Sequence, residues 1–422
     1  MRNQQADSEN TMKQEPAWVR ALGGTEHLFW LLDRNRAIHF ALVAEIDRVF
    51  EPSAWHAALL AIQQRHPLLS TRIVAGRDGA PAFHRDPDAR IPLRVVENAR
   101  ASWQVEAASE MNAPFDWSTA PLVRATLLQG ERGSTVILAA HHSVLDGMGG
   151  AYVMEDLLCA LAGGSLMSLP LVQPLESLLR AQMATATVPG AMAPAPEPKV
   201  FRAASGARAE VAALALSAPL TRAVVERSRM ERTTVHGALA AAVNEAGRRL
   251  SQAWRERSVR TVSPIDVRRT VGGMGQANGV YITQTVTVDD RPQGAPFWDA
   301  AREVKARLAP AQTHASVVQE TKALDAFMSS NPSVEDTAGF LSHMLAFDVL
   351  LSNLGREPVA SAYEGFALKA LWGPIVSSGF KDDQVVGVCT QGGVLRLTQA
   401  SYTAMPGLLD EVCAVLSEAV AA

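Results

Sequence analysis

The stretch that most constrains the fold is "VILAAHHSVLDGMGGAYVMEDLLCAL", where a nearly unbroken apolar run is followed by a short turn and a new pattern. A continuous apolar run predicts a strand that is buried on both faces. After the turn, the apolar residues from Val153 to Leu161 recur at helical spacing and predict a helix. The order strand, turn, helix places His141, His142, Asp146 and Gly147 at one junction.

The two adjacent histidines are predicted to have different roles. Neighbouring residues at a strand end project to opposite sides, so His141 and His142 cannot easily bind one metal ion. The pattern instead predicts that one imidazole packs into the structure while the other faces a cavity, where it can act as a single general base. The alternative is a pair of core histidines beside a glycine turn, but four residues of fixed type and spacing favour catalysis by His142.

One neutral imidazole is suited to acyl transfer from a thioester. It can take a proton from an attacking alcohol or amine and return it to the departing thiolate, without a covalent enzyme intermediate. Asp146 is expected to stiffen the turn by pairing with an arginine behind it, and Gly147 to let the backbone bend sharply. Backbone amides at the start of the helix would favour a developing oxyanion.

Several other sites are excluded by their missing motifs. The chain has no G-x-S-x-G elbow, no phosphate loop ending in Gly-Lys-Ser/Thr and no H-E-x-x-H helix. The segment "GGMGQANG" only approaches a dinucleotide fingerprint, because Asn278 stands where the third glycine belongs. We therefore interpret it as a loop.

Composition indicates an ordinary soluble protein with more than one core. A chain of 422 residues exceeds what one hydrophobic core usually serves. With 48% hydrophobic residues, 19% charged residues and a net charge of −4, it shows no bias toward nucleic acid or a membrane surface. It has no apolar run long enough to span a membrane. Three distant cysteines and the absence of a secretory signal predict reduced thiols in the cytoplasm.

The predicted organisation is two mixed α/β subdomains joined by a linker. Residues 1–17 are expected to form a flexible tail, 18–180 the N-terminal subdomain, 181–205 a Pro/Ala-rich crossover linker and 206–422 the C-terminal subdomain. The expected helices include "EPSAWHAALLAIQQR", "ASWQVEAASEMN", "PLTRAVVERSRM", "TTVHGALAAAVNEAGRRL", "FWDAAREVKARL" and "MPGLLDEVCAVLSEAV". The expected strands include "LSTRIVAG" and "APAFHRD" as a hairpin, "PLVRATLLQ", "VRTVSPIDV", "GVYITQTVTV", "HMLAFDVLLSNLG", "FALKALWG", "DQVVGVCTQGG" and "VLRLTQAS".

The motif "HHSVLDG" resembles the H-H-x-x-x-D-G signature of the condensation-domain superfamily of acyltransferases, which includes chloramphenicol acetyltransferase. Further segments resemble the family in the same order, namely "ALLAIQQRHPLLSTRI", "APFDWSTAPLVRATLL", "TTVHGALAAAV", "SPIDVRR" and "LLSNLG". The resemblance covers roughly residues 25 to 410. It implies two chloramphenicol acetyltransferase-like α/β subdomains in a V-shaped arrangement, with an active-site tunnel that reaches His142 from both faces.

The resemblance also implies roles for individual residues. His142 is similar to the family's catalytic base and belongs with Asp146 and Gly147 to the catalytic motif, while His141 is similar to its structural neighbour. Asp146 resembles an aspartate that points toward an arginine, and Arg268 of "SPIDVRR" occupies the matching position. The alternative for Arg268 is an ordinary surface charge.

The tunnel residues implied by the resemblance are Ser352 and Asn353 of "LLSNLG" and Trp372 of "LWGPIVSSGF". Packing or turn formation is the alternative for Asn353. The family's D-F-G-W-G element is absent, and Trp372 lies in that general region. This departure weakens the transfer of acceptor geometry from peptide-forming members, so the chain looks closest to free-standing polyketide-associated acyltransferases.

These features predict an acyltransferase that forms an ester in polyketide or lipid-like secondary metabolism. The donor would be the phosphopantetheine thioester of an acyl carrier protein or of coenzyme A, arriving from another molecule, and the acceptor a small alcohol. We expect no permanently bound cofactor and no metal. Two alternatives stay open: an amine acceptor giving an amide, and a catalytically silent scaffold that docks carrier proteins. The scaffold predicts a damaged motif, whereas His142, Asp146 and Gly147 are intact.

Overall fold

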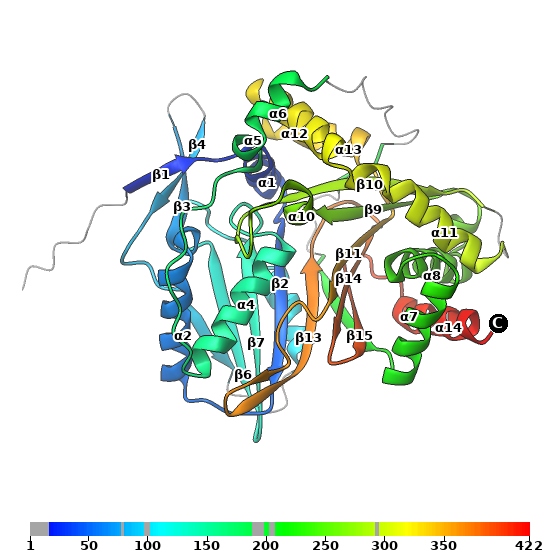
Figure 1. Ribbon diagram of the computed structural model, residues 1–422, viewed down its shortest axis with the longest axis horizontal. Coiled ribbons are helices and arrows are strands. Elements are labelled where there is room, and N and C mark those ends of the chain that lie inside the picture. The colour runs from blue at the N-terminus through cyan, green and yellow to red at the C-terminus, as the bar shows by residue number, and fades with distance from the viewer. Residues whose placement is uncertain (1–16, 77–79, 97–101, 188–197, 202–206, 292–294) are drawn as a thin grey trace, which may run out of the picture.

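Within the residues that the structure describes, the strands form three sheets, two of them six-stranded (Figure 1). The structure is a computed structural model, and it describes residues 17–76, 80–96, 102–187, 198–201, 207–291 and 295–422. The predicted tail lies outside the described residues except for Ala17, which begins β1 (Ala17–Ala21). No helix in the described ranges is both long enough and apolar enough to cross a membrane.

The first six-stranded sheet carries the histidine motif at the end of a buried inner strand, β7. In spatial order it contains β12 (Ala362–Tyr363), β13 (Phe366–Val376), β2 (His39–Ile46), β7 (Ser134–His141), β6 (Val123–Gln129) and β5 (Leu93–Val96). β7 is antiparallel to both β2 and β6, and every residue of it except Thr135 is buried. The predicted two-sided burial of this strand is therefore confirmed.

The second six-stranded sheet is covered on one face by four helices. In spatial order it contains β10 (Ile282–Asp289), β9 (Val259–Asp266), β11 (Val349–Arg356), β14 (Gln384–Gln391), β15 (Val394–Ser401) and β8 (Glu210–Ala215). The helices are α7 (Ala218–Met230), α8 (Val235–Leu250), α11 (Phe297–Leu308) and α14 (Leu408–Ala421), seen beside the sheet in Figure 1. Thr234 caps α8, since its side chain accepts a hydrogen bond from the Gly237 amide.

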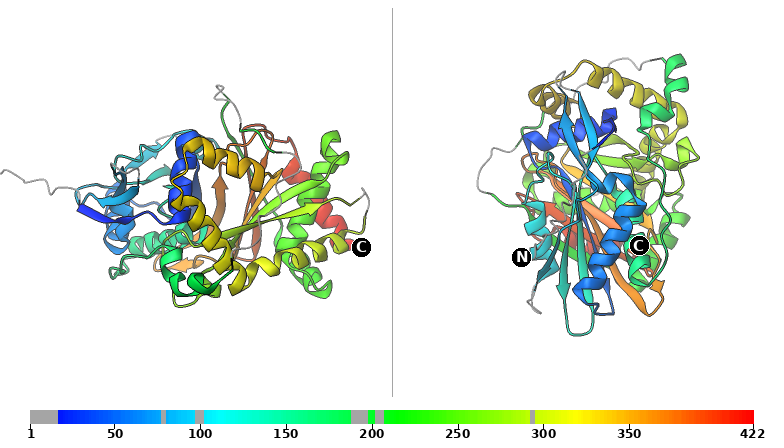
Figure 2. Two further views of the ribbon diagram at one scale, coloured as in Figure 1. Left: turned by 90° about the horizontal axis from the view of Figure 1, so that it is seen from above. Right: turned by 90° about the vertical axis from the view of Figure 1, so that its left-hand side faces the viewer.

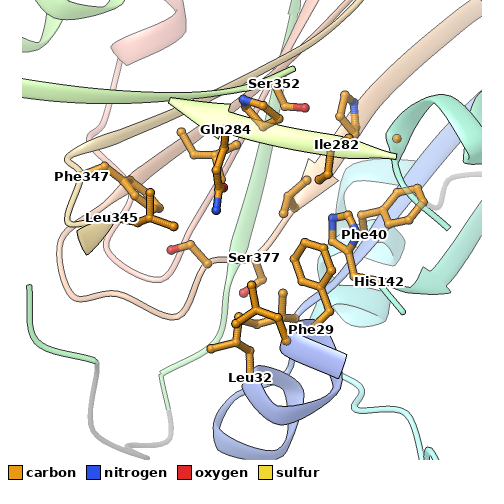
Figure 3. A pocket seen from close by; sticks show the side chains of 18 of the residues that line it. Phe29, Leu32, Phe40, His142, Ile282, Gln284, Leu345, Phe347, Ser352 and Ser377 are labelled. Atoms are coloured by element: carbon orange, nitrogen blue, oxygen red, sulfur yellow. The ribbon is translucent and has the colours of Figure 1, made fainter. Parts of the chain in front are cut away.

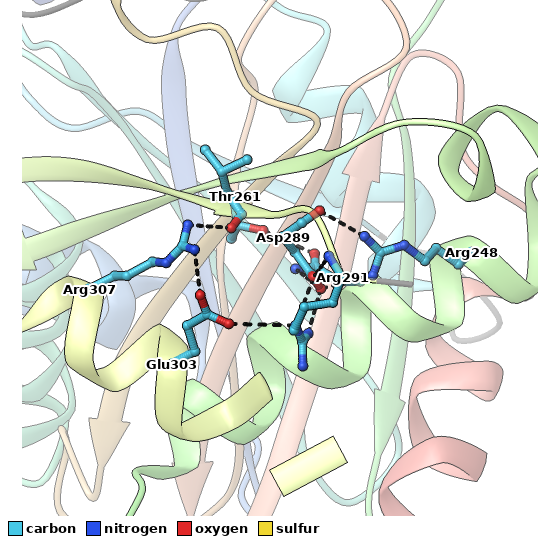
Figure 4. A network of polar contacts seen from close by, with 8 residues as sticks. Arg248, Thr261, Asp289, Arg291, Glu303 and Arg307 are labelled. Carbon is cyan, nitrogen blue, oxygen red and sulfur yellow. Dashed lines mark hydrogen bonds and ion pairs between the residues drawn. The ribbon is translucent and has the colours of Figure 1, made fainter. Parts of the chain in front are cut away.

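The interior face of α8 is also held to the second sheet by polar contacts (Figure 4). Arg248 donates to Asp289 Oδ2 at 2.9 Å, and Arg291 donates to the same oxygen at 2.8 Å. Both Arg248 and Asp289 are buried, so each charge has its partner inside the structure. This network fixes the end of β10 against α8.

Two helices and a small sheet accompany the first sheet. The predicted hairpin is present as β3 (Thr71–Ala75) and β4 (Pro81–Arg85), although residues 77–79 of its turn are outside the described residues, and β1 adds a third strand. α2 (Pro52–Arg65) packs along α4 (Gly147–Leu161), and a short 3-10 turn (Pro67–Ser70) follows it. Asp156 of α4 accepts a hydrogen bond from Arg65 Nε at 2.6 Å and lies 2.7 Å from His66 Nε2, which fixes the end of α2 against α4.

Three helices of eleven or more residues were not expected from the sequence. They are α1 (Gly24–Asn35), α12 (His314–Ser329) and α13 (Val334–Met344), which lie next to one another (Figure 2). Because α13 includes His343 and Met344, β11 begins six residues later than the strand predicted from "HMLAFDVLLSNLG". The remaining helices are α3 (Trp103–Met111), α5 (Leu175–Leu178), α6 (Arg180–Thr185), α9 (Gln252–Arg255), α10 (Arg268–Val271) and the 3-10 helix at Pro310–Gln312.

The first residues of the predicted linker are helical instead of irregular. α6 covers them, because Met183 packs into an apolar cluster with Leu175, Val267 and Val318. Residues 188–197 and 202–205 of the linker lie outside the described residues.

The predicted C-terminal subdomain, residues 206–422, contributes two strands to the first sheet. β12 and β13 come from residues 206–422, yet they pair into the first sheet, with β13 antiparallel to β2. β13 also packs closely on β14: a Cβ on Gly387 would lie 2.0 Å from the carbonyl oxygen of Pro374. The two subdomains therefore meet at β13, which belongs to residues 206–422 in the chain but pairs with β2 in the first sheet.

Candidate active site

His142 follows β7 directly, and residues 142–146 form the turn that leads into α4. Its imidazole lines a cavity bordered by strands of both large sheets (Figure 3). The ring stacks on Phe29 of α1, with ring centroids 4.1 Å apart and an interplanar angle of 6°, and Phe40 of β2 lies 5.1 Å away. Two aromatic rings thus hold the imidazole at the cavity wall, where 7% of the residue is exposed.

Burial determines the protonation state of this histidine. The pKa of His142 is lowered to about 4, mainly because a charged imidazolium would lose its hydration in these surroundings. The negative charge of Asp146 acts in the opposite direction but is outweighed. His142 is therefore neutral at pH 7 and able to accept a proton. Its Nδ1 is buried and has no hydrogen-bond partner among the described residues.

His141 points into packed structure, away from the cavity. Its side chain is fully buried, its Nδ1 accepts a hydrogen bond from the Ser143 amide at 3.1 Å, and its Nε2 lies 3.5 Å from Asp33 Oδ2. The two histidines therefore face different surroundings, as the sequence predicts for the end of a strand. In the described part of the chain, no group of three His, Cys, Asp or Glu side chains is placed to hold a metal ion.

Asp146 is fully buried behind the turn and does not line the cavity. Its two carboxylate oxygens accept hydrogen bonds from the backbone amides of Gly149 at 2.7 Å and Tyr281 at 2.8 Å. Arg268 donates to both oxygens, each at 2.9 Å. With these contacts Asp146 caps α4 and ties the turn to the second sheet, so its place in the structure is that of a positioning residue.

Arg268 is the predicted partner of Asp146, and it is buried instead of exposed. Only 4% of the residue is accessible, and its guanidinium also donates to Asp266 Oδ1 at 2.7 Å and to the carbonyl oxygens of Ala277 and Gly279. The alternative of an ordinary surface charge is therefore wrong. The loop "GGMGQANG" supplies these carbonyl oxygens, and as expected it contains no helix or strand.

Gly147 is the first residue of α4 and lines the cavity. The expected special backbone bend is absent, because its φ is not positive. A Cβ at this position would lie 3.1 Å from Leu354 Cδ2 and 3.7 Å from Pro374 Cγ. The structural reason for glycine here is therefore space beside His142.

The cavity encloses about 1040 Å³, including the part open to solvent. Its walls come from six regions of the chain: α1, β2, the start of α4, β9 with β10, α13 with β11, and the end of β13 with the loop after it. The lining residues are Leu28, Phe29, Leu32, Ile38, Phe40, His142, Gly147, Met148, Pro264, Asp266, Ile282, Gln284, Leu341, Leu345, Phe347, Leu350, Ser352, Asn353, Leu354, Pro374, Val376, Ser377, Ser378 and Phe380.

Two of the three predicted tunnel residues line this cavity. Ser352 and Asn353 lie on β11, and Ser352 is labelled in Figure 3. Asn353 also forms a turn, because its Oδ1 accepts a hydrogen bond from the Gly355 amide at 2.8 Å. Both interpretations of Asn353 therefore describe the structure.

The third predicted tunnel residue, Trp372, lies outside the cavity. Its ring packs against Trp103 on the opposite face of the first sheet, and its Nε1 donates to Glu45 Oε1 at 2.5 Å. The register of β13 shifts between Trp372 and Ile375, so both of these residues share that face while Pro374 and Val376 line the cavity. The extra residue in this irregular stretch is the physical reason for the correction.

The sequence did not single out Phe29, Phe40 or Gln284. The run "IHFALVAEI" indicates a strand, but it does not say that Phe40 lies next to His142. Ile282 and Gln284 lie two residues apart on β10, so their side chains share the face that lines the cavity. This spacing of two is the signal in the sequence that relates Gln284 to Ile282. No signal in the sequence identifies the stacking of Phe29 on the imidazole, because it depends on the packing of α1.

Comparison with known proteins identifies a family model and relatives that each match part of the chain. Residues 28–175 match the family model described as Condensation domain. Tyrocidine synthase 3 of Brevibacillus parabrevis is 30% identical over 114 residues, which are 27% of this chain and 2% of that protein. The chain therefore spans only a small part of the length of the curated relatives that it matches.

Solved structures share the fold over nearly the whole chain. Polyketide synthase associated protein 5 from Mycobacterium tuberculosis gives a TM-score of 0.71 at 16% identity, over 96% of this chain and 98% of that one. The TRI3 trichothecene 15-O-acetyltransferase from Fusarium sporotrichioides gives a TM-score of 0.67 at 12% identity, over 95% of this chain and 94% of that one. At these identities the likeness is one of fold.

The fold is the mixed α/β, two-subdomain arrangement of solved condensation domains, which are chloramphenicol acetyltransferase-like. The segment matched by the family model contains the whole histidine motif. The resemblance to condensation domains is therefore confirmed by the family match in residues 28–175, and over the rest of the described chain the likeness to solved condensation domains is one of fold.

Proposed function

We propose that this protein transfers an acyl group from a phosphopantetheine thioester, carried by an acyl carrier protein or by coenzyme A, to a small-molecule hydroxyl. His142 is the general base. The observation that carries the proposal is a neutral, buried imidazole at the wall of an apolar cavity, on a turn that the pair Asp146 and Arg268 fixes from behind.

The proposed proton path uses one ring nitrogen. Because Nδ1 of His142 is enclosed, we assign the base to Nε2. Nε2 takes the proton of the acceptor hydroxyl while the hydroxyl oxygen bonds to the thioester carbonyl carbon. The C–S bond then breaks, and the imidazolium returns the proton to the departing thiolate. An imidazolium with a pKa of about 4 gives up its proton readily, which favours the second step.

We assign stabilisation of the developing oxyanion to the N-terminus of α4. Gly147 and Met148 border the cavity and are the first two residues of a 15-residue helix, so their amides have no acceptor within the helix. Within α4, the carboxylate of Asp146 accepts its hydrogen bond from the following amide, that of Gly149, and not from the amides of Gly147 and Met148. Donors aimed at a developing negative charge lower the barrier to acyl transfer.

The comparisons support this proposal at the level of family and fold. One structural neighbour is named as an O-acetyltransferase and another as polyketide synthase associated, which favours ester formation. The match to Condensation domains and to tyrocidine synthase 3 favours the second candidate, an amide-forming enzyme with an amine acceptor. A docking scaffold would need neither the neutral imidazole nor the cavity beside it.

The experiment offers acyl-loaded carrier protein and acyl coenzyme A to the purified chain, each with alcohol and amine acceptors, and identifies products by intact mass spectrometry. His142→Ala is expected to lower turnover by about 10²- to 10⁴-fold, as for loss of a general base. His236→Gln is the matched control. Burial also lowers the pKa of His236 to about 4, but this ring contacts Ser263 and does not line the cavity.

The outcomes separate the candidates. Ester formation that depends on His142 supports the proposal, whereas amide as the sole product transfers support to the second candidate. Turnover that is unchanged in folded His142→Ala contradicts the assignment of the base. Carrier binding without any product would identify the scaffold.

A further inference from the structure

We infer that the cavity beside His142 binds an uncharged, apolar chain attached to the reacting group, and that Phe347 and Phe380 limit its length. The inference rests on the proposed function, because it names the substrate class for that site. An acyl donor and an alcohol acceptor can both carry such a chain, and the experiment below distinguishes these two sources.

The cavity wall offers no positively charged partner to a chain that ends in a carboxylate. Among the described residues that line it, only His142 and Asp266 have side chains that titrate. The Asp266 carboxylate already accepts a hydrogen bond from Arg268 at 2.7 Å, and no lysine or arginine is among the described residues of the cavity wall. A carboxylate group on the chain would therefore be buried without a partner of its own, which is costly.

The wall opposite His142 is apolar. Figure 3 shows His142, Phe29 and Phe40 together at one side of the cavity, and Leu345 and Phe347 at the other. A chain that reacts at the imidazole and extends into the cavity therefore ends against aliphatic and aromatic side chains. Burial of each further methylene there is favourable until the space is filled.

The far wall is braced from behind, so it acts as a stop. Phe380 is 2% exposed, its ring lies 5.2 Å from Phe347 at an angle of 81°, and Phe201 packs on its other side at 4.5 Å. The segment that carries Phe201 is held to α13, because the Lys199 amide donates to the Ser342 carbonyl oxygen at 3.1 Å. Side chains packed this closely resist displacement by a chain that is too long.

The test measures kcat/KM for two ladders of substrates. In the first ladder, straight-chain N-acetylcysteamine thioesters from acetyl to palmitoyl react with one fixed alcohol. In the second, straight-chain alcohols of increasing length react with the acetyl thioester. Phe347→Ala is expected to move the preferred length upward and Leu345→Phe to move it downward in the same ladder, by about fourfold in relative kcat/KM for each methylene.

A matched control and a binding measurement complete the design. Phe327→Ala removes a ring that stacks on Phe340 near the same helices but does not line the cavity, so it should leave both profiles unchanged. Calorimetric titration with amide analogues of the thioesters reports chain binding without turnover, and it is repeated with a chain that ends in a carboxylate.

A shift in the thioester ladder assigns the chain to the donor, and a shift in the alcohol ladder assigns it to the acceptor. Unchanged profiles in both cavity variants overturn the inference, as does equal use or binding of the carboxylate-ended chain. Length-dependent binding that shifts in Phe347→Ala without any turnover leaves the inference standing and removes the proposed function. Turnover whose chain-length profile is the same in the cavity variants overturns the inference and leaves the proposed function standing.

Discussion

Replacing Asp146 by alanine removes one carboxylate that four hydrogen bonds share. Loss of one partner of a buried ion pair costs about 3 to 5 kcal/mol. The lower end applies here, because the Arg268 guanidinium keeps its contacts with Asp266 and with two backbone carbonyl oxygens. The unpaired Tyr281 amide adds about 1 kcal/mol, and the lost cap of α4 adds about 1 kcal/mol.

These effects share one side chain and do not simply add, so we expect Asp146→Ala to lower the free energy of unfolding by about 4 kcal/mol. Urea unfolding followed by circular dichroism measures the loss. Asp146→Asn retains an oxygen for the Gly149 amide and should cost less. Asp266→Asn is the control at the same arginine: its carboxylate is 31% exposed, and a loss below about 1 kcal/mol is expected.

A double-mutant cycle separates the ion pair from the other contacts. Because Arg268→Met removes the charge that Asp146→Ala strands, the double variant should be less destabilised than the sum of the two single variants. Additive effects would refute the reasoning about the pair. If Asp146→Ala unfolds at the urea concentration of the unchanged protein but is inactive, Asp146 acts in the chemistry itself and not through the position of the turn.

Two more predictions concern the base and the corrected tunnel residue. Because the pKa of His142 is lowered to about 4, kcat/KM should be constant above about pH 5.5 and fall about tenfold per pH unit below 4, and an apparent pKa near 6.5 would contradict this. The fold favours the neutral ring, so the free energy of unfolding also decreases as pH falls from 6.5 toward 4, and circular dichroism at each pH checks that the protein is still folded. Trp372→Phe should leave kcat and KM unchanged, since the ring lies outside the cavity, and cost about 1 kcal/mol of stability through the lost hydrogen bond to Glu45. A change in KM of about fivefold for Trp372→Phe, which corresponds to about 1 kcal/mol of binding free energy, would place this residue back at the substrate.

The strand, turn and helix around His142 were predictable because local rules decide them. Apolar runs and helical spacing fix β7 and α4, and alternation at a strand end separates the two imidazoles. The partner of Asp146 is different: Arg268 is 122 residues away, and only the family resemblance related the two positions. Local pattern and family likeness thus supplied different parts of the site.

The position of Trp372 shows why the cavity wall was harder to predict. Side chains alternate along a strand, so one extra residue in β13 reverses which face every later side chain takes. The sequence "LWGPIVSSGF" does not reveal where that residue is inserted. The same limit applies to the pairing of β13 with β2, because strand partners distant in the chain are chosen by the packing of both subdomains.

The proposed base and the proposed chain-binding wall are held in place by different kinds of contact. The base is fixed by residues of one turn and by one ion pair behind it, at Asp146 and Arg268. The cavity is assembled from six regions that meet only in the folded chain, and Phe347 on its far wall is braced by Phe380 and not by that ion pair. Changes at the wall can therefore alter which chain binds while the imidazole keeps its position and its protonation state. Under the proposed function, the histidine motif therefore carries the acyl transfer, and the wall residues determine which substrate reacts.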